Sequence, residues 1–168
     1  MRVVSWNMNH ANNSGSHEAA WAFLLSLEPD IALVQEAVVP EDVPYTSIWE
    51  PGWDHLPWGT AILSRVGALE VSWRDHLRGA VIAARCDLPG IGEATVASVH
   101  ARIVDRRVVP ALRETFEEIR RNLRERFIVG GDLNTARAAG IAWPQNGHTE
   151  FWSDVEAWGF QDCYYVLH

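Results

Sequence analysis

Four short apolar segments of the sequence each end in a side chain that can bind a metal ion or a phosphate group. They are Val3–Asn7, Pro29–Glu36, Val96–His100 and Ile128–Asn134. A β-strand that leaves a hydrophobic core carries its last residue to the edge of the sheet, where open α/β sheets bind their ligands. If the four ends meet at one edge, their polar residues line a single cleft. The sequence therefore predicts a hydrolytic metal site.

Glu36 and Asn7 are the predicted metal-site residues. Glu36 follows the continuous apolar run Ile31–Val34, which is typical of a strand buried on both faces. Its carboxylate suits Mg²⁺ or Mn²⁺, because such hard cations prefer oxygen ligands. Asn7 could orient Glu36 or reach the metal through its carbonyl oxygen. The alternatives are a solvated strand end for Glu36 and a local turn for Asn7.

His100, Asp132 and Asn134 are the predicted catalytic residues. Two glycines precede Asp132 and allow close backbone approach, and Asp132 and Asn134 point the same way if the strand continues. Asp132 could align or deprotonate a water, and Asn134 could bind a phosphate oxygen. His100 could donate a hydrogen bond to a developing phosphoryl charge. The alternatives are Asx side chains that cap a turn and a histidine with ordinary structural partners.

Composition bounds the class of protein. The 168 residues, 48% of them apolar, suit a single globular domain over residues 1–168. All fourteen basic residues are Arg, which excludes Schiff-base chemistry and a Walker-type phosphate loop. The net charge of -8 argues against a broadly basic surface that holds nucleic acid, but not against a phosphate substrate held by a divalent ion.

Targeting signals and cysteines add little to this description. The chain shows no basic leader and no apolar run of membrane-spanning length, so we expect no membrane span and a cytoplasmic location. Cys86 and Cys163 are too few for a disulfide framework or a four-cysteine zinc site.

Periodicity and turn residues predict the elements that position the site. A stripe of Ala20, Phe23, Leu24 and Leu27 predicts a core-facing helix that Pro29 ends. Residues 37–58, rich in proline and tryptophan, predict a long loop that walls the site. Strands are expected at 59–64 and 69–73, a hairpin at 79–87 and 93–100, and helices from 110 and from about 149.

Five segments together resemble the endonuclease/exonuclease/phosphatase superfamily, whose members include deoxyribonuclease I, exonuclease III-type repair enzymes, neutral sphingomyelinases and inositol polyphosphate 5-phosphatases. These segments occur in the family's order and span nearly the whole chain. They are Ser5–Asn9, Pro29–Glu36, Gly59–Arg65, Val99–His100 and Gly131–Thr135.

The resemblance implies an α/β fold in which two mixed sheets pack face to face with flanking helices, the deoxyribonuclease I-like four-layer sandwich. It implies a divalent metal at Glu36 assisted by Asn7, a phosphate held by His100 and Asn134, and a water positioned by Asp132. The implied activity is metal-assisted hydrolysis of a phosphoester, most simply of a phosphodiester or nucleic acid.

The sequence departs from the family pattern at its end. The family continues past the third helix with further strands and a Ser-Asp-His segment, whereas this sequence ends at His168, which we do not equate with that histidine. We therefore expect a domain that is incomplete at the C-terminus and lacks the last strands. A longer gene product or a partner could complete the sheet, and the alternative function is a non-catalytic member that serves in binding or assembly.

Overall fold

The structure is a computed structural model that describes residues 1–10, 17–52, 56–74, 80–101, 108–122, 126–137, 147–163 and 166. Its contacts divide the chain into two compact units. The first comprises residues 1–100 and 123–132, and the second comprises residues 101–122 and 133–168. Each unit is described by itself. The predicted single domain over residues 1–168 stays a prediction.

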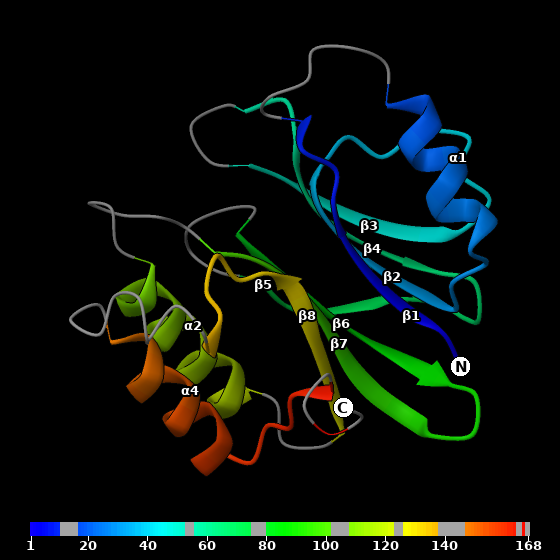
Figure 1. Ribbon diagram of the computed structural model, residues 1–168. Coiled ribbons are helices and arrows are strands. Elements are labelled where there is room, and N and C mark those ends of the chain that lie inside the picture. Colours follow the sequence, from blue (N-terminus) through cyan, green and yellow to red (C-terminus); the bar gives the residue numbers. More distant parts are fainter. Residues whose placement is uncertain are drawn as a thin grey trace. The chain divides into compact units, whose positions relative to one another are not determined.

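The first unit contains two mixed sheets (Figure 1). In the first sheet, with strand order β1-β2-β4-β3, β1 runs parallel to β2, and β4 is antiparallel to both β2 and β3. In the second sheet, with order β5-β6-β7-β8, β7 runs parallel to β8 and the other pairs are antiparallel. The strand bounds are β1 Val3–Asn7, β2 Ile31–Ala37, β3 Thr46–Pro51, β4 Gly59–Ser64, β5 Glu70–Arg74, β6 Val81–Leu88, β7 Gly92–His100 and β8 Phe127–Asp132.

The inner faces of the two sheets form one apolar core. Ile31 and Leu33 of β2 belong to the same buried cluster as Val96 of β7, and Ile128 of β8 packs against that cluster. Because side chains alternate along a strand, every second residue of each strand enters this layer. The predicted strands at 59–64 and 69–73 and the hairpin around residue 90 are thereby confirmed.

The outer face of the first sheet is covered by helix α1 (Glu18–Ser26). Trp21 and Leu24 of α1 pack against Ala32 and Val34, the outward residues of β2. The predicted helix is confirmed, but the predicted buried stripe is wrong in part. Phe23 is 54% exposed and Trp21 occupies the core instead, because turning the helix this way buries the larger aromatic ring.

The predicted loop over residues 37–58 is wrong for its second half, because β3 (Thr46–Pro51) lies within it. β3 is an edge strand that pairs with β4 along its whole length. Its side chains are exposed or half-buried, so it lacks the apolar run that marks a central strand. Pro51 is tolerated because it is the last residue of an edge strand.

The second unit contains α2 (Val109–Asn122) and α4 (His148–Ala157), which pack together. Phe116 of α2 meets Phe151 of α4 edge to face, with ring centroids 5.4 Å apart. Arg113 of α2 pairs with Asp154 of α4. Gly159 follows α4 with a φ of 93°, which confirms the predicted end of that helix.

None of the helices in the described residues combines the length and the apolar character that a membrane crossing needs. The predicted C-terminal departure from the family falls at residues 164–168. Of these, only Val166 belongs to the described part of the chain.

Candidate functional site

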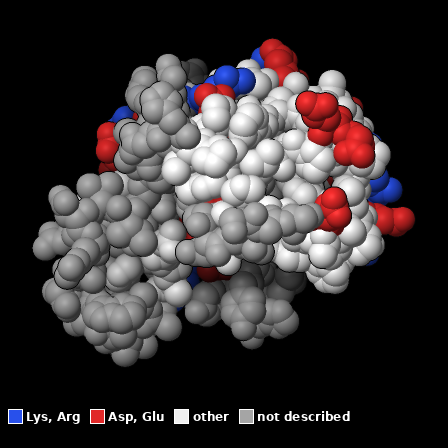
Figure 2. All heavy atoms as spheres, turned by 90° about the horizontal axis from the view of Figure 1, so that it is seen from above, with Lys and Arg blue, Asp and Glu red and all other residues white. Residues whose placement is uncertain are grey.

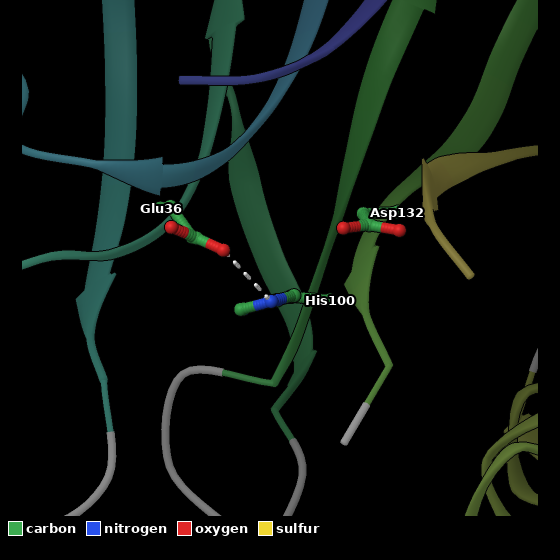
Figure 3. A group of neighbouring side chains, drawn as sticks. All are labelled: Glu36, His100 and Asp132. Atoms are coloured by element: carbon green, nitrogen blue, oxygen red, sulfur yellow. Dashed lines mark ion pairs between the residues drawn. The ribbon is translucent and has the colours of Figure 1, made fainter. Parts of the chain in front are cut away.

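The site lies where the inner rows of the two sheets change from apolar to polar. Along β1 the inner row ends in Asn7, along β7 in His100 and along β8 in Asp132. Each of these residues is the last of its strand. Because β1 runs parallel to β2 and β7 runs parallel to β8, the carboxyl ends of these neighbouring strands lie side by side. The strand-end convergence expected from the sequence therefore occurs for these three residues and for Glu36. Figure 3 shows Glu36, His100 and Asp132.

Glu36 reaches the site through a β-bulge. Between the pairs Val34–Ala61 and Ala37–Gly59, β2 contains two residues where β4 contains one. Regular alternation would send Glu36 toward helix α1, but Ala37 occupies that outer position, and Glu36 adopts a φ of 48°. Such a φ is strained for a residue with a side chain, and bulges are a common means of re-aiming one beside a site.

Asn7 links the two carboxylates. Its Nδ2 donates to Glu36 Oε1 at 3.2 Å and to Asp132 Oδ2 at 2.8 Å. Its Oδ1 accepts the backbone N–H of Asn9 at 2.7 Å, which fixes the orientation of the amide. The group that Asn7 presents to Glu36 and Asp132 is thus its NH₂, which is the arrangement expected if it orients Glu36. Its role as a metal ligand stays a prediction.

His100 faces the same two carboxylates (Figure 3). Its Nε2 lies 3.6 Å from Glu36 Oε1, and one ligand atom from each of Glu36, His100 and Asp132 lies within 4.8 Å of the others. Burial lowers the pKa of His100 below its ordinary value of 6.5, although Glu36 and Asp132 act in the opposite direction. His100 is therefore neutral near pH 7, and the site contains two carboxylates beside a neutral imidazole.

The two glycines before Asp132 are required by close contacts. A Cβ atom at Gly131 would lie 1.8 Å from the carbonyl oxygen of Val99 in the neighbouring strand. A Cβ atom at Gly130 would lie 2.8 Å from Leu33 Cδ1 and 3.5 Å from Ser5 Cβ, both in the other sheet. Because Gly130 has no side chain, β8 approaches β1 closely enough for the hydrogen bond between Asp132 and Asn7. The predicted close approach is confirmed.

Asn134 belongs to the second unit. Its φ is 49°, and its Nδ2 donates to the carbonyl oxygen of Ala101, in the same unit, at 3.2 Å. The predicted contact between Asn134 and a substrate phosphate stays a prediction, as do the catalytic roles of His100 and Asp132.

Trp58 and Gln35 also lie at the site. Trp58 ends the segment 37–58 that is expected to wall it, whereas the sequence does not predict a place for Gln35 there. The ring of Trp58 is buried, with its centroid 5.8 Å from that of His100. Gln35 is fully buried and donates from Nε2 to Ser98 Oγ at 2.9 Å. The available signal for Gln35 was an amide at the end of an otherwise apolar buried run, which requires a hydrogen-bond partner.

Comparison with solved structures identifies the fold. An endonuclease/exonuclease/phosphatase from Beutenbergia cavernae DSM 12333 matches with a TM-score of 0.69 and 19% identity over 98% of this chain and 55% of that one. The endonuclease domain of TRAS1, a telomere-specific non-LTR retrotransposon, matches with a TM-score of 0.63 and 18% identity over 82% and 62%. D. rerio TDP2 complexed with a single strand DNA product matches with a TM-score of 0.58 and 14% identity over 83% and 63%.

These matches confirm the predicted α/β fold with two mixed sheets packed face to face. The chain spans between about half and two thirds of the length of these three structures. A search of curated proteins finds no match. The sequence profile described as "Endonuclease/Exonuclease/phosphatase family" matches residues 4–160, nearly the whole chain. The chain therefore belongs to the endonuclease/exonuclease/phosphatase family.

Proposed function

We propose that this protein is a divalent-metal-dependent hydrolase of phosphoester bonds that acts on phosphodiesters. The observation that carries the proposal is the convergence of Glu36, His100 and Asp132, with ligand atoms within 4.8 Å of one another, in a member of a family named for nucleases and phosphatases. Nucleases and phosphatases both hydrolyse phosphoester bonds.

The donor set suits Mg²⁺ or Mn²⁺. Glu36 and Asp132 supply carboxylate oxygens, which hard divalent cations prefer. Both accept hydrogen bonds from the single amide of Asn7, which holds two like charges close together before any ion binds. In the proposed assignment Glu36 is the principal ligand. A bound cation would act as a Lewis acid toward a phosphoryl oxygen and stabilise the leaving oxygen.

The residues of the chain have separate proposed roles. Asp132, fixed at Oδ2 by Asn7, orients the attacking water or accepts its proton at the other oxygen. His100 is neutral at pH 7, so its imidazole can donate one N–H to the developing phosphoryl charge without adding a positive charge to the resting site. Asn134 binds a phosphate oxygen through its amide.

The surface favours small or single-stranded substrates over tightly held duplex DNA. On the face in Figure 2, acidic side chains (red) are scattered over a largely uncharged described surface, and basic ones (blue) are few. The net charge is -8, and proteins that hold duplex DNA do so chiefly by neutralising its phosphates with Lys and Arg. The complex of TDP2 with single strand DNA supports the choice of a nucleic acid. Lipid phosphodiesters and small phosphomonoesters are the competing substrates.

The proposal is tested by incubating the protein with Mg²⁺ or Mn²⁺ and four substrates: plasmid DNA, a labelled single-stranded oligonucleotide, a chromogenic phosphodiester and a chromogenic phosphomonoester. Controls are EDTA and the variant Glu36→Gln. Glu93→Gln serves as the matched variant, because Glu93 lies on β7 at the end opposite to His100. We expect cleavage of the single strand and the phosphodiester that EDTA and Glu36→Gln abolish and Glu93→Gln preserves.

Metal binding without turnover of any substrate would contradict the hydrolase proposal for this chain. It would support the alternative of a metal-binding member of the family that serves in binding or assembly, or one that a partner completes.

A further inference from the structure

We propose that Gln35 and Ser98 form a positioning pair, a hydrogen-bonded link between the two sheets that sets the spacing between Glu36 and His100. The inference rests on the proposed function for its catalytic consequence. Its structural consequence can be measured independently of any activity.

The pair joins the sheets at the point where regular strand pairing stops. Gln35 Nε2 donates to Ser98 Oγ at 2.9 Å, and Ser98 Oγ donates in turn to the carbonyl oxygen of Val34 at 3.3 Å. Val34 is the last residue of β2 in regular register with β4 before the bulge. One serine of β7 is thus bonded both to a side chain and to the backbone of β2.

The chemistry of this pair is unusual for its position. Gln35 follows Ile31 and Leu33 in the inner row of β2, as Ser98 follows Val96 in the inner row of β7. Both Gln35 and Ser98 are 0% exposed. Within the described residues, Gln35 Oε1 is buried without a hydrogen-bond partner.

A buried acceptor without a partner destabilises a fold, so two apolar side chains would serve a purely structural layer better. Buried polar pairs instead fix one relative arrangement of the elements that they join, because any displacement breaks the bond in a medium of low dielectric constant. The pair is therefore better explained by a role in fixing the arrangement of β2 and β7 than by a contribution to the stability of the fold.

The pair is adjacent to the groups that it would position. Glu36 is the next residue after Gln35, and His100 is the next inner-row residue after Ser98. Glu36 Oε1 and His100 Nε2 lie 3.6 Å apart, one from each sheet. Because the bulge leaves Glu36 outside the regular ladder, the adjacent Gln35–Ser98 bond between β2 and β7 is placed to hold this distance.

The test compares Ser98→Val with Ser98→Thr, two variants of the same shape that differ in the hydroxyl group. Gln35→Met removes the amide from the other side and keeps the length of the side chain. We expect Ser98→Val and Gln35→Met to lower kcat about tenfold with KM changed less than about twofold, because small displacements of catalytic groups act mainly on the chemical step. Ser98→Thr should stay close to the wild type.

Hydrogen exchange of backbone amides supplies the second readout. The amide of Met8, which donates to Gln35 O, and that of His100, which donates to Ala80 O, should exchange about tenfold faster in Ser98→Val than in Ser98→Thr. The amides of Asp30 and Thr95, which are bonded at the far ends of the sheets, should exchange equally in the two variants.

Equal kcat and equal exchange in Ser98→Val and Ser98→Thr would overturn the proposal, and so would faster exchange at both ends of the sheets, which indicates general destabilisation. If the wild type cleaves none of the substrates, the proposed function fails, and the exchange rates alone decide whether the pair positions the strand ends. If Ser98→Val and Ser98→Thr both fail to fold, Gln35→Met against the wild type gives the same two readouts.

Discussion

Replacing Glu36 by glutamine removes one negative charge from the site and keeps the length of the side chain and an oxygen that can accept the Asn7 hydrogen bond. In the proposed metal site, the two carboxylates repel each other whenever no cation lies between them. We therefore expect Glu36→Gln to stabilise the metal-free protein and to abolish its stabilisation by metal.

The magnitude follows from the geometry. Two unit charges 4.8 Å apart, the upper limit between ligand atoms of Glu36 and Asp132, repel by about 3 kcal/mol at an effective dielectric constant near 20. The charge-assisted hydrogen bond from Asn7 to Glu36, which weakens in the variant, offsets about 1–2 kcal/mol of this. The metal-free variant should thus be more stable by about 1–2 kcal/mol, or about 2–8 °C in Tm for a chain of this size.

Metal acts in the opposite direction on the wild type. A ligand at a hundred times its Kd stabilises the folded state by about 2.7 kcal/mol, which corresponds to about 5–10 °C in Tm. The assay is thermal unfolding at pH 8, where His100 is neutral, in EDTA and in a Mn²⁺ titration. Glu93→Gln is measured alongside as the matched control.

The order of stabilities should reverse between the two conditions: Glu36→Gln above the wild type in EDTA, and the wild type above Glu36→Gln in saturating Mn²⁺. The reasoning is refuted if the variant is less stable than the wild type in EDTA and gains as much from Mn²⁺. That result would identify Glu36 as a structural partner of His100 and Asn7 and not as a metal ligand.

Three further predictions follow from the geometry of the same site. In EDTA, the free energy of unfolding should fall as the pH drops below 6.5, because burial lowers the pKa of His100 in the folded state and the unfolded chain takes up the proton first. Urea titrations from pH 5 to 8 measure this free energy, and its dependence on pH should be weaker in His100→Gln. The same dependence in both proteins would count against this. Gly131→Ala should destabilise the protein by about 3 kcal/mol or more, because its Cβ meets fixed backbone. Gly130→Ala should cost about 1 kcal/mol, because its Cβ meets the movable end of Leu33. Equal losses of unfolding free energy in the two variants, measured by chemical unfolding, would contradict the contacts described. Asn7→Ala should weaken Mn²⁺ binding about 10–100-fold, as removal of a residue that orients metal ligands generally does; calorimetry that finds an unchanged Kd would exclude this role.

The sequence predicted the strand ends well because their signals are local. A buried apolar run followed by Glu36, and Gly-Gly followed by Asp132, are visible without any knowledge of pairing. The carboxyl ends of β1, β2, β7 and β8 then meet because each of these strands runs parallel to its neighbour within its own sheet. Topology therefore explains why four separate local signals describe one site.

The features that the sequence did not predict depend on pairing between distant segments. The bulge at Glu36 is defined by the residues of β4 that pair with β2, and no pattern in the sequence of β2 itself predicts it. The sequence predicts a loop where β3 lies, because an edge strand needs no continuous apolar run. Helical spacing predicts Phe23 in the core, but α1 is rotated so that Trp21 is buried and Phe23 is exposed.

The bulge in β2 makes this site sensitive to the length of the strand as well as to its residue types. Deleting Gln35 would restore the pleat and move the Glu36 carboxylate into the buried inner-row position that Gln35 occupies, one residue short of the strand end. A one-codon deletion at Gln35 would thus displace the proposed metal-site carboxylate while leaving Glu36 itself encoded. Screens limited to point substitutions would miss that route to inactivation.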